Sequence, residues 1–195
     1  ARVKAQDVRR TDRKEQIEGS LQRAKDARVK AKDLKNKEKT QLRERLSKVQ
    51  DEKKRAVVEK ISQKFNDILK KSTDRLAGYL NKAEAVLQRI ENRTDEVEDR
   101  GVDVTATRQA ISSAYSRIDS ARGENTAQTT EVVSLSENIN DEETLKTDVQ
   151  RVRDSLKRKL ETLRSRAFGA RDAVKVAAQA LRTDFTNSQG LENNN

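Results

Sequence analysis

The chain has 195 residues, of which 39% are charged and 3% are aromatic, and it contains no proline, cysteine, histidine, methionine or tryptophan. The absence of cysteine excludes disulfides and thiolate metal sites. So few aromatic side chains are atypical of a compact globular core. The abundance of charged, helix-forming residues is instead typical of long helices and coiled coils.

The formal net charge of +10 is unevenly distributed. Residues 1–60 hold 21 Lys and Arg against 11 Asp and Glu, whereas residues 61–195 hold 22 of each. One interpretation is a solvated helix stabilised by i,i+4 pairs such as Asp26–Lys30 and Asp33–Lys37. The other is an arm that attracts nucleic acid, anionic lipid or an acidic surface polymer. The candidate polyanion-binding residues are Arg23, Lys25, Arg28, Lys30, Lys32, Lys35, Lys37 and Lys39.

Apolar residues recur at steps of three and four from the start of the chain to about residue 99, and no proline interrupts them. This spacing predicts one very long N-terminal helix over about residues 5–99. The apolar stripe is thin before residue 40, so we expect residues 1–50 to form a basic, charge-rich arm without a partner in the same chain. The candidate self-association residues in it are Ile17, Leu21, Leu42, Leu46 and Val49.

Gly101 predicts the end of this helix, because a residue with positive φ commonly follows a helix C-terminus. Asp103 or Thr105 then caps a second helix over about 104–124. A link this short predicts that the two helices are antiparallel neighbours. The carboxylates just before the turn are interpreted as a solvated helix end rather than a metal site; they are Asp95, Glu96, Glu98 and Asp99.

Residues 125–140 contain β-branched residues that favour extended backbone, and they predict a loop. The third helix, about 141–186, has the most regular spacing in the chain, from Leu145 to Leu181. Gly78 and Gly169 stand inside predicted helices, where we expect close contact with a neighbouring helix to be the reason for glycine. We expect residues 187–195 to form a disordered tail.

Together these elements predict an all-α protein. Its core is an elongated antiparallel three-helix bundle, or coiled-coil hairpin, over residues 51–186. The predicted helices of this core span about 51–99, 104–124 and 141–186. The arm 1–50 extends beyond the core, because the third helix matches only part of the first in length.

Without histidine and cysteine, the chain lacks the commonest general base, the commonest nucleophile and most transition-metal ligands. We therefore expect no enzyme, cofactor, metal or small-molecule substrate. We expect a structural or interaction protein that acts as a spacer, stalk or assembly subunit, with itself or another helical protein as partner. The alternative is a module that binds nucleic acid or an anionic membrane surface through residues 1–60. A lipid binder of the apolipoprotein kind is disfavoured by the narrow apolar stripes.

The segments "RGVDVTATRQAI" and "LKTDVQRVRDSLKRKLETLRSRAFGARDAVKVAAQAL" support a resemblance. Residues 40–182 resemble a group of helical proteins from candidate-phylum (Patescibacteria-type) bacteria that have no established activity. The resemblance implies no functional residues. It implies an extracellular or cell-envelope protein whose signal peptide has been removed. Ala1 is a residue that often follows such a cleavage, and a sequence start unrelated to cleavage explains it equally well. A cytoplasmic location stays open.

Overall fold

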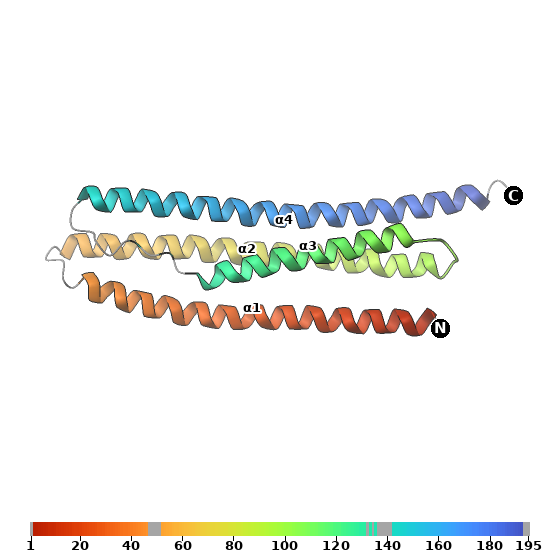
Figure 1. Cartoon of the computed structure of the whole chain (residues 1–195), viewed down its shortest axis with the longest axis horizontal. Coiled ribbons are helices and arrows are strands. Elements are labelled where there is room, and N and C mark those ends of the chain that lie inside the picture. The colour runs from red at the N-terminus through yellow and green to blue at the C-terminus, as the bar shows by residue number, and fades with distance from the viewer. Residues whose placement is uncertain (1, 47–51, 132, 134, 136–141, 193–195) are drawn as a thin grey trace. The chain divides into compact units, whose positions relative to one another are not determined.

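The chain folds into four helices, shown in Figure 1, and this computed structural model describes residues 2–46, 52–131, 133, 135 and 142–192. No strand occurs among these residues, so the predicted all-α class is confirmed. None of the helices in the described ranges combines the length and apolarity needed to cross a bilayer. The helices are α1 (Arg2–Leu46), α2 (Glu52–Glu98), α3 (Thr105–Thr130) and α4 (Glu142–Glu192).

The predictions of one helix over 5–99 and of a three-helix bundle are wrong. The region contains two helices, α1 and α2, so the described chain has four in all. Residues 47–51 between them lie outside the described residues. The apolar spacing continues at helical period on both sides, and neither proline nor glycine stands between them. Periodicity alone therefore could not distinguish two helices from one.

The chain forms two compact units, each built from several segments. The first unit contains Ala1–Leu21, Leu76–Gly123 and Arg164–Asn195, and the second contains Gln22–Arg75 and Glu124–Leu163. Because α1 contributes to both units, residues 1–46 do not form the separate arm that the sequence predicts. Each unit combines segments of all four helices.

The core of the first unit is formed by α2, α3 and α4. Tyr115 and Ile118 of α3 are completely or almost completely buried, as is Leu87 of α2. Small alanines on α4 face these large side chains, which allows the helices to approach closely. The buried members of this core are Leu80, Leu87, Ile90, Ile111, Ala114, Tyr115, Ile118, Ala121, Ala167, Ala170, Val174 and Ala177.

The core of the second unit is smaller, and α1 contributes to it. Its buried members are Val58 of α2, Leu135 after α3, and Val152 of α4. Leu42 of α1 packs against this cluster as a partly buried residue. The other partly buried members are Ile61, Phe65, Val133, Leu145 and Val149.

The turn between α2 and α3 has the backbone geometry and the helix cap that the sequence predicts. Gly101 has a φ of 89°, which is the positive φ predicted for it. The Asp103 carboxylate accepts hydrogen bonds from the backbone N–H of Thr105 at 3.0 Å and from its hydroxyl at 2.7 Å. These two bonds hold the pKa of Asp103 below its ordinary value. Asp103 thus satisfies an otherwise free amide at the start of α3.

Other boundaries differ from the prediction. Helix α3 continues to Thr130, so the expected loop 125–140 is helical in its first six residues. Thr129 and Thr130 both donate their hydroxyls to carbonyls of the preceding helical turn, which accommodates these β-branched residues in a helix. Helix α4 extends to Glu192, so the expected disordered tail 187–195 is helical as far as that residue.

Gly78 and Gly169 do not mark close helix contacts. A Cβ atom added to Gly78 would have no neighbouring atom within 4 Å, and one added to Gly169 would meet only the Arg117 guanidinium at 3.9 Å. The interpretation of these positions as helix-packing sites is therefore wrong. The structure offers no packing reason for glycine at Gly78.

Candidate interaction surface

In the second unit, α1 faces α2 along a row of opposite charges. Basic residues of α1 follow one another at gaps of seven and eight, and acidic residues of α2 show the same gaps in reverse order. A gap of seven or eight residues returns to the same face of a helix. The basic residues are Arg28, Lys35 and Arg43, and the acidic residues are Asp74, Asp67 and Glu59.

These residues meet in order, as expected of antiparallel helices. The Arg28 guanidinium lies 3.3 Å from the Asp74 carboxylate, and that of Arg43 lies 3.4 Å from Glu59. Between these pairs, Lys35 interacts electrostatically with Asp67. We call these three pairings the charge ladder. Its two ion pairs are half exposed, so each contributes up to about 1 kcal/mol and mainly sets which residues face one another.

Lys35 is the least solvated base of the charge ladder. Its ammonium donates a hydrogen bond to the backbone carbonyl of Asn66 at 3.3 Å. Partial burial lowers the pKa of Lys35, and the favourable charges of Asp67 and Asp74 only partly oppose that effect. Lys35 therefore has less freedom than a surface lysine to follow an external partner.

Two shallow grooves adjoin the charge ladder, with volumes of about 400 Å³ and 260 Å³. They share Lys35 and Asn36 of α1. The larger groove has Ala31 and Leu69 in its lining, and its rim contains bases from both helices. Those bases are Arg28, Lys32, Lys35 and Lys70, opposed by Asp74 and Glu131. The smaller groove has equal numbers of acidic and basic residues.

Asn66 of α2 also forms hydrogen bonds with the segment that follows α3. Its amide accepts a hydrogen bond from the backbone N–H of Val133 at 3.1 Å and donates one to the carbonyl of Val133 at 2.9 Å. This two-bond pairing replaces the backbone partners that a helix would supply. Val133 consequently lines the smaller groove beside Leu42.

The structure separates the predicted polyanion-binding residues into two sets on opposite flanks of α1. Arg28 and Lys35 belong to the charge ladder, and Lys25, Lys32 and Lys39 stand three or four residues from them on the same flank. The remaining three, Arg23, Lys30 and Lys37, lie on the other flank and are exposed. Only the first flank adjoins the grooves.

The predicted self-association residues do not form one exposed stripe. Leu42 packs into the core of the second unit, Ile17 is half-buried in the first unit, and Leu21 is 38% exposed. Val49 and the side chain of Leu46 lie outside what the structure describes. Exposed apolar residues that the prediction omitted include Val29 at 63%.

Two of the predicted i,i+4 pairs, both within α1, are not observed. Neither Asp26–Lys30 nor Asp33–Lys37 is among the ion pairs of the described residues, and Asp26 instead accepts a hydrogen bond from Gln22 at 2.9 Å. Arg28 and Arg43 of α1 instead form ion pairs with α2.

The carboxylate cluster before Gly101 is not simply a solvated helix end. Asp95 is only 5% exposed, and with Glu98 it accepts hydrogen bonds from the Arg108 guanidinium of α3. Burial alone would lower the pKa of Arg108, but the hydrogen bonds to Glu98 and Asp95 outweigh it and raise that pKa. No group of three or more residues suited to hold a metal ion occurs in the described ranges.

Among the described residues, the most buried ion pair lies in the first unit, between Arg122 of α3 and Glu84 of α2. Both side chains are 8% exposed, and the guanidinium donates to the two carboxylate oxygens at 3.2 Å and 2.9 Å. The same guanidinium donates to Ser20 of α1 at 3.2 Å and to Asn81 at 3.3 Å. One side chain thus links three helices, which sequence spacing had not indicated.

A second contact of the first unit involves Tyr115, which is 2% exposed. Its hydroxyl donates to the Glu91 carboxylate at 2.8 Å, and the Arg13 guanidinium of α1 lies over the ring at 3.7 Å from the centroid. Burial and the Glu91 charge raise the pKa of Tyr115 far above its ordinary value, partly opposed by Arg13. Tyr115 of α3 therefore contacts α1 through a cation–π interaction and α2 through a hydrogen bond.

Comparison of the chain with protein-family models, with curated proteins and with solved structures found no match.

Proposed function

We propose that this protein is a non-enzymatic structural or interaction protein, a helical spacer or assembly subunit that acts through helix–helix contacts. The contact between Arg122 and Glu84 is the main support. A buried guanidinium that bridges three helices holds their side chains in one arrangement. Tyr115 and Arg108 use their polar groups in the same way. The polar groups of Arg122, Tyr115 and Arg108 therefore form contacts between helices.

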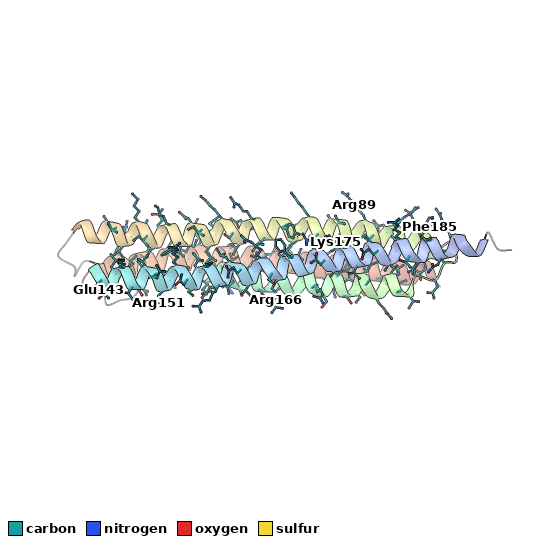
Figure 2. The ribbon with its side chains drawn as sticks, turned by 90° about the horizontal axis from the view of Figure 1, so that it is seen from above. Arg89, Glu143, Arg151, Arg166, Lys175 and Phe185 are labelled. Carbon is teal, nitrogen blue, oxygen red and sulfur yellow. The ribbon has the colours of Figure 1, made fainter. Side chains whose placement is uncertain are left out.

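The surface also suits a protein that works through its helix faces. Charged residues cover the outer sides of the helices, and in Figure 2 the exposed side chains of Arg151 and Arg166 project away from α4. Isolated exposed apolar residues such as Val29 and Val176 stand among them. Export to the cell envelope or exterior is part of the same proposal and rests on the sequence resemblance alone. Fractionation of the native cells, with antibody detection, tests it.

Sedimentation velocity from 1 to about 100 µM protein tests the assembly role. We expect the mean mass to rise with concentration, and we expect Leu21→Lys to reduce that rise, because a buried interface disfavours a charge. Val176→Lys is the control, because it places the same charge at an apolar position of α4 that is 55% exposed, against 38% for Leu21. A monomer at every concentration would contradict the proposed assembly.

A second candidate function is the binding of a polyanion. The second unit holds 25 Lys and Arg against 18 Asp and Glu, a surplus of seven out of the net charge of ten. A field of this sign attracts polyanions at low ionic strength. This observation favours the second unit over the whole length of residues 1–60 as the binding region.

A further inference from the structure

The charge ladder occupies three of the bases on its flank of α1, and it leaves others without a partner. Lys25, Lys32 and Lys39 of α1 are exposed and make no ion pair with any described residue. The same is true of Lys64 and Lys71 of α2, each three residues before an acid of the charge ladder. The two sets border the charge ladder from its two helices. We call these five residues the lysine rows.

The spacing of the lysine rows is regular. Members of each row are seven residues apart, which corresponds to about 10.5 Å along a helix. The carboxylates of Asp67 and Asp74, which belong to the charge ladder, already face Lys35, Arg28 and Lys70. None of the five lysines forms an ion pair with a described residue, so their ammonium groups recur along each helix at a regular spacing and stay available to an external anion.

These features favour a rod-like polyanion over other partners. A duplex has one negative charge per about 1.7 Å of axis, so aligned lysines release counterions when they meet its phosphates. Single strands are usually bound by stacking on aromatic side chains, and α1 contains no aromatic residue. Insertion into a lipid surface needs a continuous apolar face with aromatic anchors, whereas Val29 is the sole apolar residue between Lys25 and Lys32 that is exposed.

We propose that the lysine rows bind the phosphate backbone of double-stranded nucleic acid without reading its bases. This inference rests on the polyanion-binding candidate and assigns to it a surface and a partner. Lysine acts as a mobile point charge rather than a bidentate fork, so it suits contact with any sequence. The charge ladder keeps α1 and α2 in register, and thereby keeps the two rows parallel.

The test is fluorescence anisotropy with a labelled 20-base-pair duplex, titrated with the full chain from 25 to 200 mM NaCl. Five phosphate contacts predict a slope of about −4.5 for log K against log salt concentration. The triple variant Lys25→Gln, Lys32→Gln, Lys39→Gln should reduce the slope to about −2 and weaken binding at least about tenfold at 50 mM salt. Circular dichroism checks that each variant keeps its helices.

The matched control is the triple variant Arg23→Gln, Lys30→Gln, Lys37→Gln, which removes the same charge from the other flank of α1. This control should retain most of the slope of log K against log salt concentration. An equal loss of slope and affinity in both variants overturns the lysine rows as the binding surface but leaves polyanion binding by the protein intact. Binding to phosphatidylserine vesicles or a sulfated polysaccharide, without binding to the duplex, overturns the assignment to nucleic acid. No binding to any of the three at 25 mM salt overturns both the inference and the candidate function.

Discussion

Replacing Arg122 with methionine should cause one of the largest losses of stability among single polar substitutions in the first unit. Methionine fills a similar volume but leaves the Glu84 carboxylate, 8% exposed, without its two hydrogen bonds from the guanidinium. Removing one partner of a buried pair costs about 3–5 kcal/mol, because an uncompensated charge stays buried. For a chain of this length, that corresponds to a fall in Tm of about 6–20 °C.

Urea unfolding followed by circular dichroism measures this loss, and a double-mutant cycle isolates the pair. The double variant Arg122→Met, Glu84→Leu should cost much less than the sum of the two single variants, since no charge then remains buried. Arg171→Met is the control, because the Arg171–Asp172 pair is about half exposed and its loss should change the stability little. A loss below about 1 kcal/mol for Arg122→Met, or strictly additive single variants, would refute the reasoning.

Three further predictions concern other contacts of the two units. Gly78→Ala should raise the free energy of unfolding in urea by about 1 kcal/mol, since the site is helical and open. Gly101→Ala should lower it by about 1–2 kcal/mol because Gly101 has a positive φ. A destabilising Gly78→Ala together with a stabilising Gly101→Ala would contradict the observed geometry. Tyr115 should keep its proton in the folded state above pH 10, where an unfolded tyrosine loses it, so its contribution to stability is complete below that pH and falls above it. Absorbance at 295 nm should then show one of the two tyrosines ionising only on unfolding, and two tyrosines that titrate together near pH 10 in the folded protein would disprove this. Asn66→Ala should cost about 1–3 kcal/mol and speed hydrogen exchange at the Val133 amide; an unchanged exchange rate would show that the amide pairing does not protect that segment.

The elements marked by strong local signals could be predicted from the sequence. The helix end at Gly101 and the cap at Asp103 both depend on residues within a few positions of one another. Apolar side chains at helical period likewise indicate the face that α4 buries. In each of these cases the physical cause is local, so the local sequence is sufficient.

The break between α1 and α2 could not be predicted, because neither glycine nor proline marks it. Because this break was not predicted, the predicted fold gave α1 no partner helix, and residues 1–50 were interpreted as an isolated basic arm. The partner of Ser20, Arg122, lies 102 residues away, and no spacing rule connects them. The bases of α1 and the acids of α2 have matching gaps of seven and eight residues in the sequence. These gaps predict the charge ladder only once it is known that α1 pairs with α2.

The unequal gaps of the charge ladder also limit axial sliding of α1 in the second unit. If α1 moved by one heptad in the direction that brings Arg28 opposite Asp67, Arg43 would come opposite Glu52, but Lys35 would come opposite Lys60, and these two positive charges would repel. Movement by one heptad in the other direction would leave Arg28 and Arg43 facing the uncharged amides of Asn81 and Asn66. The uneven spacing therefore allows all three pairings of opposite charge at one axial position of α1 and fewer of them one heptad away in either direction.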